Sequence, residues 1–264
     1  MSSLHALLLG LLQGLTEYLP ISSSAHLKMA ELLLGLHNPE QMLLFDLICH
    51  LGTLTALGLF FRSDLGLLRR APRDTLWLIA CAILPLFPFY FLLKPLREWC
   101  SQPELLGFFL MCTSAILFLG ERWRVTRVPL PTSGTRFVDA LWIGAMQSTA
   151  LIPGISRSAS TISCARVLGW DMREAVRFSF LLSIPTILGG NMLQGAKLLV
   201  HADLRPALSL PPLLIAFFSS AGVGWIVLRH AVRFLERGNL KPFAWYCLVV
   251  GGLVTLYLNL VPHG

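Results

Sequence analysis

Charged residues are scarce in this chain of 264 residues, because Asp, Glu, Lys and Arg together make up only 13% of it while hydrophobic residues make up 55%. A soluble domain carries about 25% charged residues. The mean hydropathy of +0.68 is likewise more apolar than that of a soluble protein. The shortage of charge therefore excludes an ordinary soluble domain and indicates an integral membrane protein.

Three further features of the composition narrow the class of protein. No Lys or Arg precedes Lys28, so the beginning of the chain lacks the basic region of a cleaved signal peptide, and we expect this segment to be retained. The six cysteines show neither CxxC nor CxxxH spacing, which is typical of small apolar side chains and not of a zinc site or a disulfide framework. The net charge of +7 comes from basic residues near the ends of apolar segments, so we expect contact with membrane lipids and no nucleic-acid partner.

Six apolar windows are long enough to cross a membrane as helices, which takes about 20 residues. They are Met42–Phe61, Thr75–Leu93, Glu104–Gly120, Val176–Ala196, Leu210–Leu228 and Pro242–Val261. Two further apolar stretches, 4–36 and 137–170, are interrupted in the middle by Pro, Gly and Ser. The predicted fold class is an all-α polytopic membrane protein with six transmembrane helices and two re-entrant helix pairs.

The two interrupted stretches resemble each other. Residues 6–25 align with residues 140–159 without a gap, and eight of the twenty positions are identical. The matches include a Gln and two Ser at fixed spacing, which chance similarity between apolar segments does not explain. We call this pairing the repeat alignment. We therefore predict a single membrane domain, 1–264, built from a first repeat, 1–134, and a second repeat, 135–264.

The predicted topology of the repeats is inverted. Each repeat holds one re-entrant pair and three spans, and an odd number of crossings makes the second repeat enter the membrane from the opposite side. Four Lys or Arg occur in each of the loops 62–74, 121–136 and 229–241, whereas the loops 94–103 and 197–209 carry two each. With the richer loops in the cytoplasm, both termini face outward, and the two Ser-rich breaks approach each other inside the membrane.

The breaks predict a cavity that binds an anion. Irregular backbone at membrane depth is tolerated only where it is buried in protein or lines a watery cavity. We expect Pro20 and Pro153 to end the first helix of each pair, and the serines that follow to cap the second helix. The N-termini of the second helices then point N–H groups into the cavity, and Arg157 adds a guanidinium that suits phosphate or carboxylate.

Glu17 is a carboxyl in an apolar stretch without a cationic neighbour in sequence, so it requires a metal ion, a proton or a cation from another segment. Gln13 lies one helical turn earlier on the same face, and both side chains present oxygens that suit a divalent cation. A protonated Glu17 bonded to a helix end is the alternative. Asp46 and His50, four residues apart in the first full span, form either a proton relay beside Glu17 or a mutually bonded pair, and we leave them outside the site.

The serines at 22, 23 and 24 are candidate nucleophiles for phosphoryl transfer or hydrolysis, with His26 or Glu17 as the base. For His26, a capping or packing role is the alternative. A site of this kind also needs charge neutralisation around the phosphate, and usually a divalent metal. The residues alone leave the choice of nucleophile open.

Two segments carry a resemblance to a known family. "QGLTEYLPISSSAHL" (13–27) resembles the Glu/Gln-x-x-x-Glu region, and "PGISRSAST" (153–161) resembles the Pro-Gly-x-Ser-Arg-Ser-x-x-Thr motif, of the bacterial undecaprenyl pyrophosphate phosphatases of the BacA/UppP type. Both motifs occur in the same order and at a similar separation. "FDLICHLGT" (45–53) and "FSFLLSIPTILGG" (178–190) are also similar to that family. The resemblance covers nearly the whole chain.

The resemblance implies hydrolysis of undecaprenyl pyrophosphate to undecaprenyl phosphate and inorganic phosphate at the outer face of the bacterial cytoplasmic (inner) membrane. This reaction recycles a lipid carrier for the cell wall and is linked to bacitracin resistance. Catalytic roles then fall on Glu17, Ser23, His26 and Arg157. Phosphate-binding roles fall on Ser22, Ser24, Gly154, Ser156, Arg157, Ser158 and Thr161. Gln13 and Glu17 become the expected ligands of a divalent cation, Mg²⁺ or Ca²⁺.

The pattern of the family is not matched everywhere. Gln13 stands where many members have Glu, which weakens any mechanism that needs two carboxylates on one metal. The resemblance favours Ser23 as the nucleophile over attack by metal-bound water. In the repeat alignment Ser23 pairs with Arg157, so we expect one composite site with nucleophile and acid from the first repeat and the cationic group from the second.

Two rival classes of protein share some of these features. A transporter or flippase of a polyprenyl phosphate lipid also uses inverted repeats with discontinuous helices around a central site. The other class of membrane lipid phosphatase has a Ser-Arg-x5-His motif, whereas Ser163 occupies the His position here. The sequence leaves open the prenyl-chain preference, the metal used in the cell, transport of the product and the choice between monomer and homodimer.

Overall fold

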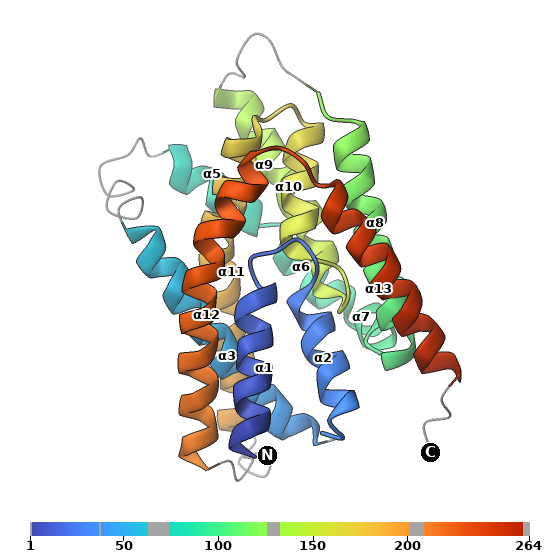
Figure 1. Ribbon diagram of the computed structural model, residues 1–264. Helices are drawn as coiled ribbons and strands as arrows, with labels where there is room; N and C mark the ends of the chain where they lie inside the picture. The colour runs from blue at the N-terminus through green and yellow to red at the C-terminus, as the bar shows by residue number, and fades with distance from the viewer. Residues whose placement is uncertain (1, 37, 63–73, 126–132, 201–208, 261–264) are drawn as a thin grey trace. The chain divides into compact units, whose positions relative to one another are not determined.

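The computed structural model describes residues 2–36, 38–62, 74–125, 133–200 and 209–260, and within these ranges every regular element is a helix (Figure 1). The first half contains α1 (Ser3–Thr16), α2 (Ser23–Leu33), α3 (Pro39–Phe60), α5 (Asp74–Ile83), α6 (Leu86–Leu92), α7 (Lys94–Cys100), the 3₁₀ helix η1 (Pro103–Leu105) and α8 (Leu106–Arg122). The second half contains α9 (Ser133–Ser148), the 3₁₀ helix η2 (Thr149–Leu151), α10 (Arg157–Val167), α11 (Met172–Val200), α12 (Leu210–Glu236) and α13 (Lys241–Leu260).

The predicted spans are confirmed. Six helical segments of the described chain are long and apolar enough to cross a membrane: Gln41–Phe60, Thr75–Leu92, Pro103–Arg122, Met172–Leu198, Leu210–Glu236 and Lys241–Leu260. The second segment differs from the uninterrupted helix that we expected, because α5 ends at Ile83 and α6 begins at Leu86. Pro85 has no backbone N–H, and its ring clashes with a helical carbonyl four residues earlier, which explains the interruption.

Part of the loop charge behind the predicted orientation falls outside the described residues. Arg69, Arg70 and Arg73 of the loop 62–74, Arg127 of the loop 121–136 and Arg205 of the loop 197–209 lie outside the described residues. The re-entrant pairs, the orientation of the termini and the inversion of the repeats therefore stay predictions.

Both breaks occur where a proline forbids a regular helix. The ring of a proline collides with the carbonyl four residues earlier in an α-helix. Four residues before Pro20 is Thr16, the last residue of α1, and four residues before Pro153 is Thr149, where α9 has already given way to η2. The prolines thus end the first helix of each pair, as the sequence predicts, but a full turn before their own positions.

The second helix of each pair is built in the same way in both halves of the chain. The helix α2 covers residues 23–33 and α10 covers residues 157–167, so their first and last residues pair in the register of the repeat alignment. Each ends at a glycine with positive φ, Gly35 at 68° and Gly169 at 88°. The closing hydrogen bonds correspond too, because Leu36 N donates to Glu31 O and Trp170 N donates to Ala165 O, both at 2.9 Å. This is the capping geometry that glycine permits, and the two helices share it, while the internal repeat itself stays a prediction.

The chain divides into two compact units, and each takes segments from both halves of the sequence. Unit 1 contains Met1–Tyr18, His26–Leu65 and Ser183–Ala231. Unit 2 contains Leu19–Ala25, Gly66–Leu182 and Val232–Gly264. The first break therefore belongs to unit 2, although α1 and most of α2 belong to unit 1.

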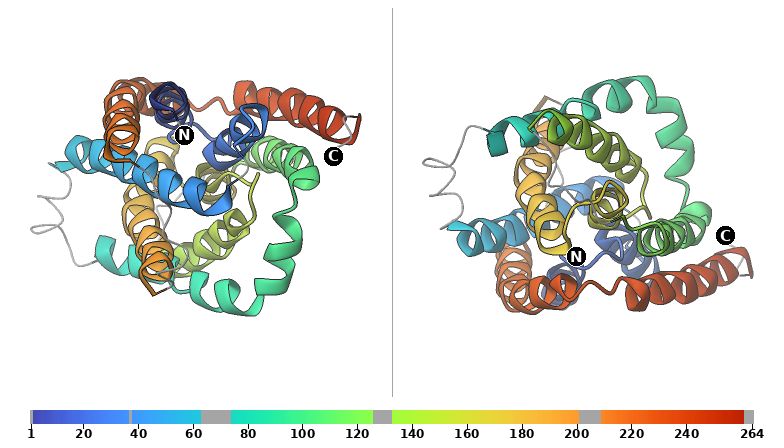
Figure 2. Two further views of the ribbon diagram at one scale, coloured as in Figure 1. Left: turned by 90° about the horizontal axis from the view of Figure 1, so that it is seen from below. Right: turned by 90° about the horizontal axis from the view of Figure 1, so that it is seen from above.

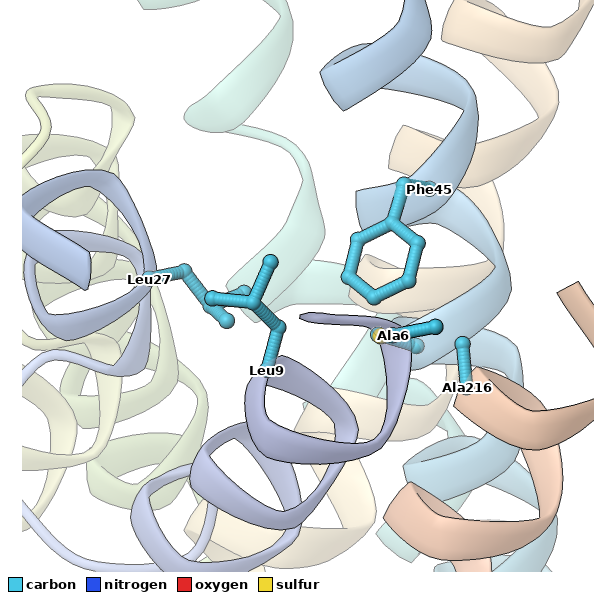
Figure 3. Close-up of a cluster of buried hydrophobic side chains, with 6 residues drawn as sticks. Ala6, Leu9, Leu27, Phe45 and Ala216 are labelled. Carbon is cyan, nitrogen blue, oxygen red and sulfur yellow. The ribbon is translucent and has the colours of Figure 1, made fainter. Parts of the chain in front are cut away.

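The core of unit 1 is formed by α1, α2, α3 and α12. Leu9 of α1 and Leu27 of α2 point toward each other, and Phe45 of α3 lies beside Ala6, which faces Ala216 of α12 (Figure 3). The helices α1 and α12 lie against each other in both views of Figure 2. A Cβ atom on Gly14 would come within 2.8 Å of Ser220 O, so only glycine allows this close approach.

The core of unit 2 depends on a similar contact between α8 and α13, which run side by side in Figures 1 and 2. A Cβ atom on Gly107 would lie 2.5 Å from Gly251 O, and a Cβ atom on Gly251 would lie 2.7 Å from Gly107 O. The pair is strengthened by Ser114, whose Oγ donates to Ala244 O at 2.7 Å. Small residues and hydroxyl hydrogen bonds are the usual means by which helices associate in lipid.

All six cysteines are free, in agreement with their reading as small apolar side chains. Burial, with a smaller contribution from the charge of Asp139, raises the pKa of the Cys164 thiol to about 12. Because the thiolate is the reactive form of cysteine, such a thiol is chemically inert at neutral pH.

Candidate active site

The site residues that lie in unit 1 include a group that we call the carboxylate centre: Gln13, Glu17 and His50. Glu17 follows the last residue of α1 and is only 7% exposed. Gln13 Nε2 donates to Glu17 Oε2 at 3.0 Å, and His50 Nε2, from the middle of α3, lies 3.8 Å from the same oxygen. His50 is therefore a neighbour of Glu17 from another segment of the chain.

The structure separates the roles of Asp46 and His50. The hydrogen bond between them runs from His50 Nδ1 to the backbone oxygen of Asp46, at 2.7 Å. The carboxyl of Asp46 interacts with Glu31 of α2. His50 thus belongs to the surroundings of Glu17. Its hydrogen bond with Asp46 uses the backbone oxygen of Asp46 and leaves the Asp46 carboxyl to Glu31.

Glu31 is a second buried carboxyl of unit 1. Its side chain is 1% exposed, and Lys28 Nζ lies 3.3 Å from its Oε2. Burial raises the pKa of the Glu31 carboxyl, and the charge of Lys28 acts against that rise. Sequence patterns do not reveal this group, because the spacing of Lys28 and Glu31 is that of an ordinary surface pair on a helix.

Ser23 and His26 both lie in the first turn of α2. Ser23 is its first residue and is half-buried, whereas His26 is buried. Residues three apart on a helix share a face, so the predicted nucleophile and the predicted base stand one above the other. Proton transfer between them stays a prediction.

The site residues of unit 2 form a second group, the serine centre, made of Leu19–Ala25 and residues 153–161. Its first part is strained, because Ser22 has a φ of 67°, the only positive value at a non-glycine residue in the described chain. Ser22 Oγ lies 3.3 Å from Ser24 Oγ. Ser158 Oγ donates to Leu19 O at 3.4 Å, so the two breaks contact each other within unit 2.

The second part of the serine centre is held by a residue from α8. Thr113 Oγ1 donates to Gly154 O at 2.8 Å and accepts from Ser156 N at 3.0 Å. Gly154 has a φ of 102°, and a Cβ atom there would lie 2.5 Å from Phe109 Cβ, so this turn requires glycine. Ser156 caps α10 by accepting a hydrogen bond from Ala159 N at 3.3 Å, as the sequence predicts.

Arg157 is the first residue of α10, and its side chain is partly exposed. Four residues later Thr161 is buried, and its Oγ1 lies 2.7 Å from Ser179 Oγ of α11 and 3.0 Å from Arg157 O. Thr161 thus fastens the first turn of α10 to α11. Its direct contact with phosphate stays a prediction.

Three residues of these surroundings lie outside the predicted site: His50, Thr113 and Ser179. His50 has a sequence signal, a titratable group within a span, which marks a functional candidate by itself. Thr113 and Ser179 are single hydroxyls in apolar helices, and such hydroxyls usually bond to their own helix. Only the fold shows that they bond to other segments.

The predicted site residues are thus distributed between the units. Gln13, Glu17 and His26 lie in unit 1, whereas Ser22, Ser23, Ser24, Gly154, Ser156, Arg157, Ser158 and Thr161 lie in unit 2. Unit 2 accordingly contains the predicted nucleophile and all of the predicted phosphate-binding residues. Unit 1 contains the predicted acid and base.

The chemistry of the carboxylate centre fits a hard cation. Gln13 Oε1 is buried and accepts no hydrogen bond, which is costly for an amide oxygen unless another group reaches it. Carboxylate and amide oxygens are the ligands that Mg²⁺ and Ca²⁺ prefer. Among the described residues no cluster holds three or more of His, Cys, Asp and Glu, so the amide oxygen of Gln13 is the further protein ligand that we consider here.

These features define a polytopic α-helical membrane protein with two broken helices. It has two polar centres: one contains a carboxyl group, and the other contains several serines and an arginine. Residues 6–253 match the family model described as "Bacitracin resistance protein BacA". The chain belongs to this family.

Several proteins similar to nearly the whole chain carry the name undecaprenyl-diphosphatase. The protein of Protochlamydia amoebophila is 39% identical, with 97% of this chain and 98% of that protein aligned. The proteins of Geobacter sulfurreducens (39% identical; 98% and 99% aligned) and Carboxydothermus hydrogenoformans (37% identical; 95% of both) carry the same name. The family expected from the two sequence motifs is therefore confirmed.

Proposed function

We propose that the chain is an undecaprenyl pyrophosphate phosphatase, which hydrolyses its substrate to undecaprenyl phosphate and inorganic phosphate. Family membership and the shared name of the relatives support this activity. The observation that carries the proposal is the contact of Ser158 Oγ with Leu19 O, which joins the two Ser-rich breaks beside Arg157. An enzyme that handles pyrophosphate needs such a concentration of hydroxyls and positive charge.

The serine centre would bind the pyrophosphate. The pyrophosphate would lie at the N-terminus of α10, where the helix dipole adds positive potential. Arg157 would supply two parallel N–H donors to phosphate oxygens. Gly154, held by Thr113, allows the backbone of this turn to lie close to the ligand.

Ser23 would attack the terminal phosphorus. Its Oγ forms a bond to phosphorus while His26, one turn along α2, takes the hydroxyl proton, and the bond from phosphorus to the bridging oxygen breaks. Undecaprenyl phosphate leaves with that oxygen. Water then hydrolyses the phosphoserine, releases inorganic phosphate and restores Ser23. Direct attack by water on the pyrophosphate is the competing route, and Ser23→Ala distinguishes the two.

Gln13 and Glu17 would hold the divalent cation, Mg²⁺ or Ca²⁺, which supplies positive charge to phosphate oxygens when bound. Glu17 offers carboxylate oxygens, and Gln13 offers the amide oxygen that has no donor. The role of this chain in the arrangement is to keep both oxygens on one face of α1 and to shield them from water.

The chain is a multi-pass membrane protein by its six apolar helices. We place it in the bacterial cytoplasmic (inner) membrane, with both termini and the active site toward the periplasm, and with the polyprenyl tail in contact with the helices and the membrane lipids. Cysteine labelling of single-cysteine variants at either terminus in intact cells tests the orientation. A homodimer is the proposed assembly, and mass photometry in nanodiscs tests it.

The activity is tested by phosphate release from undecaprenyl pyrophosphate with purified protein in nanodiscs, after EDTA and after Mg²⁺ or Ca²⁺ is added back. We expect release that EDTA stops and the metal restores. Absence of release from folded protein, together with binding of the substrate, would contradict the proposal and favour a lipid flippase. The names of the relatives support the phosphatase over that alternative.

A further inference from the structure

His50 presents one specific ring nitrogen to Glu17. A backbone carbonyl accepts hydrogen bonds and never donates, so the bond of 2.7 Å between His50 Nδ1 and Asp46 O places a hydrogen on Nδ1. In the neutral ring Nε2 then carries the lone pair, and this atom lies 3.8 Å from Glu17 Oε2. That distance is too long for a hydrogen bond. Two electron-pair donors therefore face each other.

This arrangement is the one found around metal-bound histidines. A histidine that binds a metal through one nitrogen almost always donates the other N–H to a carbonyl or carboxylate, which fixes the orientation of the ring. Asp46 O has that position relative to His50. A cation between His50 Nε2 and Glu17 Oε2 would be bound by both atoms.

Gln13 offers a third donor at the same place. Its Nε2 lies 3.0 Å from Glu17 Oε2, while its Oε1 is buried without a hydrogen-bond donor. A half-turn of the amide exchanges these atoms and brings the oxygen to about the position of the nitrogen. Two oxygens bound at about 2.1 Å to one octahedral ion lie about 3 Å apart when adjacent and about 4.2 Å apart when opposite. The separations of 3.0 and 3.8 Å from Glu17 Oε2 fall within this span.

The two helices that carry these donors are fastened beside them. Tyr18, next to Glu17, donates its hydroxyl to Thr53 O on α3, one helical turn beyond His50. Thr53 Oγ1 in turn donates to His50 O at 3.0 Å. The donors of α1 and α3 therefore face each other before any ligand arrives, which lowers the cost of binding.

We propose that His50 is a nitrogen ligand of the divalent cation of this site, together with Glu17 and Gln13, and that this donor set binds Mn²⁺ in preference to Ca²⁺. Imidazole nitrogen suits first-row transition ions, whereas Ca²⁺ is held by oxygen. The inference rests on the proposed function only for the presence of a cation site.

The test uses full-length protein in nanodiscs, stripped of metal and loaded with Mn²⁺, and electron spin-echo envelope modulation detects nitrogen bound directly to the ion. We expect nitrogen modulation in the wild type and its loss in His50→Gln, with Mn²⁺ bound about 10-fold or more weakly. His230→Gln is the matched control. His230 Nδ1 makes the same bond to its own helix, 2.9 Å from Ile226 O, but its side chain lies on an exposed face. This variant should keep both the modulation and the affinity.

Three results would overturn the inference: no Mn²⁺ binding by the wild type, binding without nitrogen modulation, or modulation that persists in His50→Gln. Phosphate release is measured on the same samples. Release without nitrogen modulation overturns the role of His50 and leaves the phosphatase intact. Nitrogen modulation without release with any of the three cations supports the ligand and overturns the proposed activity.

Discussion

The two breaks of the chain share one scaffold but carry different chemistry. In both, the second helix begins and ends at residues that pair in the repeat alignment, and in both the hydroxyls of two serines lie 3.3 Å apart, Ser22 with Ser24 and Ser156 with Ser158. In the same alignment, however, Glu17 corresponds to Leu151 and Ser23 to Arg157. In the mechanism that we propose, the first break supplies acid and nucleophile, and the second supplies the cationic group.

The backbones of the two breaks differ as well. The second break places glycine at its residue of positive φ, Gly154, whereas the first places Ser22 in the left-handed region at a cost of about 1 kcal/mol. Strain of this kind persists at functional sites because the surroundings impose it. The second break therefore adopts its turn without strain, whereas the first is held in an unfavourable conformation beside the predicted nucleophile.

Loss of the predicted nucleophile should have the largest effect. If Ser23 forms the phosphoenzyme, Ser23→Ala should lower the turnover number by about 10³-fold or more. Ser101→Ala is the control, because Ser101 is exposed and bonds to its own helix at Arg97 O. Steady-state phosphate release measures both variants. Turnover of Ser23→Ala within a few fold of the wild type would assign the attack to water.

The glycine of the second break should tolerate no side chain. Gly154→Ala places a Cβ 2.5 Å from Phe109 Cβ at a φ of 102°, so we expect a loss of about 3 kcal/mol of stability. Ser22→Gly, at the strained residue of the first break, should instead stabilise the protein by about 1 kcal/mol. Thermal unfolding in detergent compares the two. Effects of the same sign would contradict the contrast between the breaks.

The two breaks should also differ in what holds them. Thr113→Val leaves the buried Gly154 O and Ser156 N without their partner, and we expect a cost of about 2 kcal/mol. Tyr18→Phe removes one hydrogen bond to Thr53 O beside the first break and should cost about 1 kcal/mol.

Thr55→Val is the control for these two variants, because Thr55 is exposed and bonds to Leu51 O of its own helix. Its unfolding temperature should stay close to that of the wild type. If the unfolding temperature of Thr55→Val fell as far as that of Thr113→Val, the hydrogen bonds of Thr113 with Gly154 and Ser156 would contribute no more to stability than a bond within one helix.

The smallest effect concerns Glu31. Because burial raises the pKa of Glu31, the folded protein holds this proton more tightly than the unfolded chain, so stability falls as the pH rises above the usual range of a glutamate. The Glu31→Gln variant has no carboxyl at this position, so it does not show this loss of stability at high pH. The unfolding temperature of the variant relative to the wild type should therefore be higher at pH 8 than at pH 4. A difference that is constant over this range would contradict the expectation.

The sequence predicts the helices well because lipid imposes simple rules. Apolar length gives the spans, and the prolines mark the breaks, since Thr16 and Ser148 end the regular helices about one turn before a proline. The interruption at Leu84 and Pro85 is harder to predict, because a proline within a span bends some helices and interrupts others.

The candidate site is predictable only where its residues follow one another in the chain. The motifs contain Gln13, Glu17, Ser23 and Arg157, which lie at or near the ends of α1, α2 and α10. His50, Thr113 and Ser179 reach these motifs through contacts between helices, and no local pattern encodes such contacts. The strained φ of Ser22 is equally hidden, because serine rarely adopts it.

The carboxylate of the first break and the guanidinium of the second serve one reaction in the mechanism that we propose, and every other role depends on this pairing. The most direct test is phosphate release under single-turnover conditions by Glu17→Gln and Arg157→Ala, side by side in nanodiscs and with folding verified by thermal unfolding. Each variant alone should lose about 10³-fold or more in rate, and the double variant should be little slower than either. Near-normal release by one of the two variants would contradict the pairing.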